Sequence, residues 1–323
     1  MTVFLNTCIT FLQSGFVFAL IAMGYYISYT ILDFPDMTVE GTFLSGAVAY
    51  GLLVSHGINP WLGLILAFIV GLLFGTITGL LHVKLKIKPL LCGILVSTLL
   101  ISVNLVAVTA GLYGDFAGES SAMIPFGRDL ETLTAVFPIN LIPNKIGIVS
   151  GLRDLVLFLV MVVVFKLLLD AFLKTKCGLL LRAAGDNAQF VTTQAKDAGN
   201  SKILGLGIGN AYAAVAGALY TEISGNVNQS MGIGMVVIGL ASLIIGLSVF
   251  SRVHRMKATT KVILGAIIYQ ACLTIAQRLG MPSAYNKLIM AIIFTIALVL
   301  SERKKVKTKA TKQPNGKESA NHA

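Results

Sequence analysis

Few residues in this 323-residue chain are of types that do chemistry. The four histidines are scattered, and none stands in the His-Glu-x-x-His spacing of a zinc protease. The four cysteines occur singly, so they predict neither a metal site nor a disulfide framework. Neither Gly-x-Ser-x-Gly nor the Gly-x-x-x-x-Gly-Lys-Ser/Thr phosphate loop occurs in the sequence. We therefore expect no catalytic residue, no metal and no cofactor in this chain.

A second set of polar residues stands near interruptions of the apolar segments. There, fixed dipoles could replace the water around a zwitterionic solute as it crosses a membrane. The alternative for each residue is a polar side chain satisfied by helix packing or by the interface. The candidates for a translocation pathway are Asp36, Thr38, Glu40 and Asn104 in the first half, and Asn210, Glu222 and Asn228 in the second.

Composition places these residues in a membrane protein. The chain is 56% hydrophobic and only 12% charged, whereas soluble domains carry about 25% charged residues. Charge-free runs of roughly 20 residues can cross the hydrocarbon core as helices, and a barrel would instead show short alternating segments. The sequence therefore predicts an all-α, polytopic helical membrane protein.

The hydropathy pattern predicts about nine membrane segments, within a range of eight to ten. We expect a transmembrane domain over 1–301, with its main external loop at 111–153, and a basic, disordered tail over 302–323. The segments are 9–31, 36–54, 61–81, 90–110, 154–173, 203–222, 226–250, 262–277 and 288–300.

The acidic stretch before the second segment has two interpretations of equal weight. One is a plain interfacial turn, and the other is a broken or re-entrant helix that lines a pathway. In either case Asp36 can cap the helix that follows, and Gly41 and Gly46 allow close helix contact. Further along, Lys166 and Asp170 stand four residues apart and are expected to pair on one helix face.

Basic residues predict the orientation. Most of the 25 Lys and Arg residues fall in 84–88, 174–202, 252–261 and 303–317, which alternate onto one side of the membrane. By the positive-inside rule this side is cytoplasmic, so the C-terminus is inside and nine crossings leave the N-terminus outside. The net charge of +11 indicates contact with membrane lipids and not with nucleic acid.

The segment 174–202 is a long polar stretch on this basic side. Gly185, Asp186 and Asn187 form a turn and helix-start signal, and Gly199 with Asn200 forms a stop signal. A short helix is therefore predicted over 187–198, where it either rests on lipid headgroups or contacts a cytoplasmic partner. Two functions remain open, which are a permease driven by a separate motor and a secondary transporter coupled to protons or sodium. The scarcity of acids inside the apolar segments favours the motor.

The motifs of this segment carry a resemblance. The run 181–187, Leu-Arg-Ala-Ala-Gly-Asp-Asn, followed by Ala198-Gly199 and the small-residue helix 207–220, resembles binding-protein-dependent ABC importer permeases of the branched-chain amino acid and ribose type. Residues 33–46 and 82–95 resemble further regions of that family, and the similarity spans residues 11–301. One subgroup that the chain resembles is accompanied by a binding lipoprotein, and some of its members are tied to aromatic amino acids.

The resemblance implies a type II importer permease subunit that passes a small, amino-acid-like solute across the bacterial plasma membrane. It implies a homodimer, two cytoplasmic ABC ATPase subunits that bind the ATP, and an extracellular or periplasmic substrate-binding lipoprotein. It also implies that the helix at 187–198 sits in a groove of the ATPase. The residues expected to make this coupling are Arg182, Gly185, Asp186, Asn187, Phe190, Val191 and Gly199.

Overall fold

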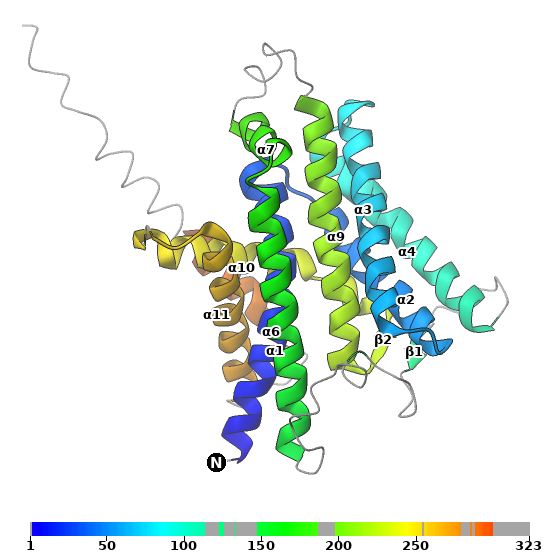
Figure 1. Cartoon of the computed structure of the whole chain (residues 1–323), viewed down its shortest axis with the longest axis vertical. Helices are drawn as coiled ribbons and strands as arrows, with labels where there is room; N and C mark the ends of the chain where they lie inside the picture. Colours follow the sequence, from blue (N-terminus) through cyan, green and yellow to red (C-terminus); the bar gives the residue numbers. More distant parts are fainter. Residues whose placement is uncertain are drawn as a thin grey trace, which may run out of the picture.

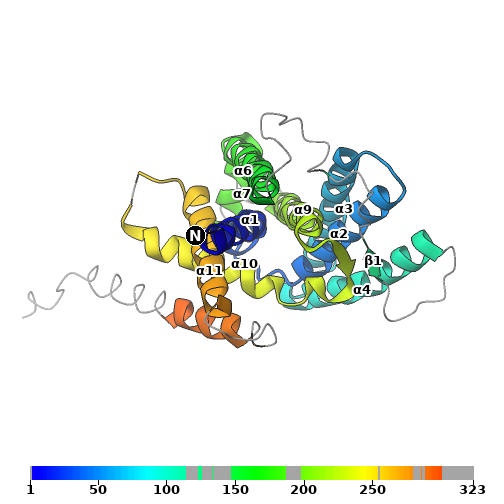
Figure 2. The same ribbon diagram turned by 90° about the horizontal axis from the view of Figure 1, so that it is seen from below.

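The computed structural model of the chain describes residues 2–113, 123–125, 133, 147–186, 198–253, 255–278, 285 and 288–299. Helices make up nearly all of these residues, and they form an elongated bundle (Figures 1 and 2). The predicted all-α class is thereby confirmed. The helices are α1 (Thr2–Tyr25), its π-helical continuation η1 (Tyr26–Ile31), α2 (Thr38–Ser55), α3 (Pro60–Val83), α4 (Pro89–Tyr113), α6 (Gly147–Phe172), α7 (Lys176–Asp186), α9 (Ala198–Ser224), η2 (Gln229–Gly232), α10 (Met235–Val249), η3 (Phe250–Arg252), α11 (Ala258–Arg278) and the apolar helix Leu288–Val299.

Length and hydropathy identify the helices that can cross a membrane. In the described part of the chain, seven helices qualify, one of them the continuous stretch Leu5–Ile31. Helix α2 and the helix Leu288–Val299 fall outside this set. The chain is a multi-pass helical membrane protein, while the count of nine crossings stays a prediction. The predicted tail 302–323 lies outside the described residues.

Helix α9 lies at the centre of the bundle, with α1, α2, α3 and α7 packed around it (Figure 1). Its most extensive contact is with α3, on which Gly71, Gly75 and Gly79 follow one another at intervals of four residues and face α9. A Cβ atom on any of the three would overlap with the backbone of α9. Small residues at this spacing let two membrane helices approach until their backbones touch.

The contact between α2 and α9 is equally close. A Cβ atom at Gly46 would overlap with the carbonyl group of Ala214, and a Cβ atom at Gly217 would overlap with that of Phe43. A Cβ atom at Gly41 would come within 2.8 Å of the side chain of Leu100 in α4. The prediction that Gly41 and Gly46 allow close helix contact is therefore confirmed.

A two-stranded sheet closes one end of the bundle. Strand β1 (Met123–Pro125) pairs antiparallel with β2 (Asn226–Asn228), with Ile124 opposite Val227. Both central side chains are buried. The pairing joins the predicted external loop to the end of α9, and nothing in the sequence pattern predicted it.

Several predicted boundaries are wrong. The helix-start signal at Gly185 lies in the last turn of α7, a helix that was not predicted, and the stop signal at Gly199 and Asn200 lies in the first turn of α9. Gly and Asn are accepted near helix starts as well as helix ends, so the signal was ambiguous. Helices α4 and α6 include residues 111–113 and 147–153 of the predicted external loop, whose place outside the membrane stays a prediction.

Replacing Gly46 with Ala tests the close contact between α2 and α9. The added methyl group overlaps with the Ala214 carbonyl, and such overpacking costs about 1–3 kcal/mol. We expect a lower midpoint of thermal unfolding for Gly46→Ala in detergent. The control is Gly151→Ala in α6, where a Cβ atom meets its nearest neighbour at an ordinary 3.4 Å and helix propensity favours Ala. Equal midpoints for the two variants would contradict the packing described here.

Candidate translocation and coupling sites

A buried polar cluster forms where the first helix breaks. Residues 32–37 separate η1 from α2, and Asp36, in this break, is 1% exposed. One carboxylate oxygen, Oδ1, accepts a hydrogen bond from the backbone N–H of Thr38, the first residue of α2, at 2.9 Å. The N-cap position itself is Met37, so the predicted cap falls one residue away. The other carboxylate oxygen, Oδ2, accepts a hydrogen bond from Nδ2 of Asn210 at 2.6 Å. Residues from the two halves of the chain thus meet in one site.

Threonines extend this cluster to a third helix. Thr42 donates to Oδ1 of Asn210 at 2.8 Å, and the hydroxyl groups of Thr38 and Thr78 lie 2.9 Å apart. Asp36, Asn210 and these three threonines are all buried. Sequence reasoning missed Thr42 and Thr78. The signal for Thr42 was its spacing of four residues from Thr38 on one helix face.

The position of the cluster along α9 shows where the break lies in the bundle. Asn210 lies about halfway along α9, whose 27 residues span about 40 Å. Asp36 is bonded to it, so the break lies inside the bundle. The structure therefore contains a break between η1 and α2 that is buried in the bundle, while the choice between an interfacial turn and a pathway-lining helix stays a prediction. The positive φ of Asp33, 51°, marks the same break.

The hydrogen bonds of the cluster leave neither carboxylate oxygen of Asp36 without a donor. A buried polar group that lacks a partner costs several kcal/mol in a membrane interior, and a charge costs more. In the part of the chain that the structure describes, the two salt bridges both belong to Asp170. Asp36 is thus stabilised by hydrogen bonds from neutral groups, without a cation.

The other predicted pathway residues lie apart from this cluster. Glu40 accepts a hydrogen bond from the backbone N–H of Gly234 at 2.9 Å, and Asn104 donates one to the carbonyl group of Gly41 at 3.4 Å. Asn228 caps η2 by accepting from the N–H of Ser230 at 3.1 Å. Together with the cluster, these bonds tie the first turn of α2 to α3, α4, α9 and the start of α10.

Glu222 lies near the far end of α9, away from the break. Its Oε1 atom accepts hydrogen bonds from the hydroxyl group of Tyr50 and from the backbone N–H of Leu133, the latter at 3.1 Å. It therefore joins α2 and α9 to the region between α4 and α6. The assignment of any of these residues to a translocation pathway stays a prediction.

The coupling residues fall around α7, beside the end of α6 (Figure 1). Arg182 is exposed on this helix, and a Cβ atom at Gly185 would overlap with the carbonyl group of Ile31 in η1. Asp186 is the last residue of α7, and Gly199 lies in the first turn of α9. Asn187, Phe190 and Val191 lie outside the described residues.

Helix α7 is amphipathic. Leu181 and Ala184 are buried, whereas Lys176 and Arg182 are exposed. Leu181 packs beside Leu32 against Gly205 of α9. The helix therefore rests on both η1 and α9, next to the break that carries Asp36.

These features define a class. The protein is a multi-pass helical bundle with a broken helix, a buried polar cluster at the break and an amphipathic helix at its basic end, as in membrane transport proteins. Among the described residues, no group of three or more His, Cys, Asp or Glu side chains could hold a metal ion.

The chain belongs to a family of permeases, described as the branched-chain amino acid transport system permease component, whose model matches residues 7–298. It is 37% identical to the tyrosine transport system permease protein of Clostridioides difficile over 88% of each chain. It is 29% identical to an uncharacterized protein of Rickettsia prowazekii, over 91% of this chain and 97% of that one.

A third relative is the probable branched-chain amino acid transport permease protein LivH of Methanocaldococcus jannaschii. It is 28% identical, over 71% of this chain and 70% of its own. No solved structure matches the chain. The resemblance inferred from residues 181–220 is thereby confirmed, and the protein is a permease of an ABC transport system, a class that works in general with ATPase and substrate-binding partners.

Replacing Asn210 with Ala tests the buried cluster. The change removes the donor to Oδ2 of Asp36 and the acceptor for Thr42, and unsatisfied buried groups cost roughly 1–3 kcal/mol each. We expect a lower midpoint of thermal unfolding in detergent. The control is Asn200→Ala on the same helix, because Asn200 is exposed. A midpoint for Asn210→Ala no lower than that of the control would refute the role of the cluster.

Proposed function

We propose that the chain is the membrane-spanning subunit of an importer for an amino acid, with no enzymatic activity of its own. Separate cytoplasmic ATPase subunits bind and hydrolyse the ATP, and an extracellular binding lipoprotein delivers the solute. Two copies of the chain form a homodimer in the bacterial plasma membrane, with the C-terminus in the cytoplasm. The family membership supports the class, and the name of the Clostridioides difficile relative supports tyrosine as the first solute to test.

One observation carries the proposed mechanism, namely the contact of α7 with the end of η1. Gly185 brings α7 into backbone contact with Ile31, and Leu181 packs beside Leu32. The segment that follows α7 is the one that the resemblance assigns to the ATPase groove. A push on this segment therefore passes through α7 to η1 and to the break at Asp36. It need only shift the balance between inward-open and outward-open states by a few kcal/mol.

The ion-coupled alternative finds less support. Coupling to protons or sodium needs an acidic group that can exchange its partner inside the bundle. Asp36 is the buried carboxylate best placed for this, but both of its oxygens accept hydrogen bonds from Thr38 and Asn210. These bonds fit a structural carboxylate better than an ion site.

The proposal is tested by co-expressing and purifying the chain with an ABC ATPase and a binding lipoprotein from the same organism. We expect a stable complex whose ATP hydrolysis rises several-fold when tyrosine or another amino acid occupies the binding protein. The measurement is phosphate release across a panel of amino acids. Failure of the three proteins to associate would refute the proposed assembly.

A variant of the predicted contact sharpens this test. Phe190→Asp places a charge in the apolar anchor that should fill the ATPase groove, so we expect stimulated hydrolysis to be lost while the permease stays folded. The control is Tyr285→Asp, which changes another aromatic side chain to Asp at a position that is 54% exposed. Unchanged stimulation in Phe190→Asp would remove segment 187–198 from the coupling mechanism.

A further inference from the structure

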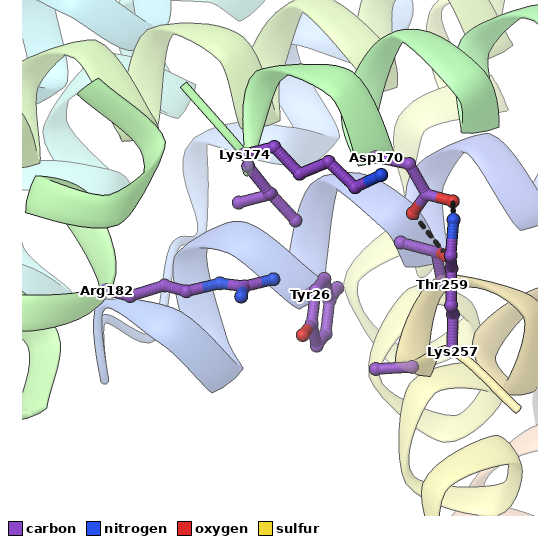
Figure 3. Close-up of a pocket in the computed structure, with 8 residues that line it drawn as sticks. Tyr26, Asp170, Lys174, Arg182, Lys257 and Thr259 are labelled. Atoms are coloured by element: carbon purple, nitrogen blue, oxygen red, sulfur yellow. Dashed lines mark hydrogen bonds and ion pairs between the residues drawn. The ribbon is translucent and has the colours of Figure 1, made fainter. Parts of the chain in front are cut away.

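A cavity of about 260 Å³ lies at the basic end of the bundle. It opens between η1, the end of α6, α7 and the start of α11 (Figure 3). Its polar lining comes from segments far apart in the sequence and comprises Tyr26, Asp170, Lys174, Arg182, Lys257 and Thr259.

The charges in this cavity do not balance. Asp170 is its one carboxylate, and it is already satisfied by Lys257 at 2.9 Å, Lys166 at 3.3 Å and Thr259 at 2.7 Å. The pairing of Lys166 with Asp170 is the one expected from their spacing. Lys174 and Arg182 also line the cavity, and within the described residues neither forms a salt bridge. The cavity therefore holds an excess of positive charge with room for an anion.

The cavity also lies at the level where a lipid headgroup would sit. Asp170 stands in the last turn of α6, Lys174 follows that helix, and Lys257 immediately precedes α11. Both α6 and α11 are long and apolar enough to cross the membrane. On the same helix, within one turn of Asp170, Leu167 and Leu168 are 57% and 56% exposed, so α6 offers apolar surface to an acyl chain.

We propose that this cavity binds the phosphate group of an anionic phospholipid. Arg182 and Lys174 supply charged donors to the phosphate oxygens, and the hydroxyl group of Tyr26 adds a neutral one. The volume lies just below the roughly 300–1,000 Å³ of pockets for drug-sized molecules, so it suits a headgroup phosphate. Basic pockets between membrane helices are known to hold such headgroups. The bound lipid would join α7 to α6 and α11, and so would hold against the bundle the helix that precedes the predicted coupling segment 187–198.

The test is binding of short-chain phosphatidylglycerol to the full chain in a neutral detergent, followed by native mass spectrometry. We expect the double variant Lys174→Gln/Arg182→Gln to bind roughly 30-fold more weakly, since each basic side chain near an anionic surface contributes about 1 kcal/mol. Phosphatidylcholine of the same chain length should bind weakly to both proteins. The charge-conserving variant Lys174→Arg/Arg182→Lys should retain most of the affinity, which separates a lost site from a misfolded protein.

The matched control is Lys84→Gln/Lys88→Gln, which removes two exposed cations from the loop between α3 and α4. It should change the affinity less than threefold. The proposal would be overturned if Lys84→Gln/Lys88→Gln lowered the affinity for phosphatidylglycerol as much as Lys174→Gln/Arg182→Gln. That result would show that the lipid is attracted to basic loops in general. Tighter binding of inorganic phosphate than of phosphatidylglycerol would overturn the lipid as the source of the phosphate. Equal binding of phosphatidylcholine and phosphatidylglycerol would overturn the site itself.

Discussion

The close approach of α9 to α2 and α3 is the constraint on which the rest of this structure depends. Lipid offers little hydrophobic drive between helices, so contact between backbones must supply the packing. Glycines at the contacts permit this approach, and a single methyl group at Gly46 or Gly71 would prevent it. Because the backbones touch, short polar side chains can reach across. Asn210 therefore bonds to Asp36, and a carboxylate is stably buried at the helix break.

The same packing connects the basic end of the protein to its centre. Helix α7 lies on η1 and α9, and η1 leads directly into the break that ends at the first turn of α2. That turn is bonded in its own right to α3, α4, α9 and the start of α10. In the proposed mechanism, a displacement at α7 would reach a point where five helices are tied together. Tightly packed elements of this kind shift between discrete arrangements and do not deform gradually.

The sequence was sufficient for the class and for most apolar segments, because hydropathy is a local property, and it located Asp36 within one residue of the N-cap of α2. It could not provide the partner of Asp36, since no local rule pairs it with Asn210 across the chain. The pairing of β1 with β2 and the basic cavity escaped prediction for the same reason. The predicted helix end at Gly199 was wrong because glycine is compatible with both ends of a helix. Asn187, Phe190 and Val191 remain predictions from the motif alone.

The central claim is that this chain neither hydrolyses ATP nor uses an ion gradient, and that ATP hydrolysis in separate subunits drives its conformational change. Uptake of labelled amino acid into lipid vesicles measures this most directly. Vesicles that contain the chain alone should accumulate no solute under a proton or sodium gradient, and accumulation should begin when the ATPase, ATP and binding protein are added. Accumulation by the chain alone on an ion gradient would contradict the account.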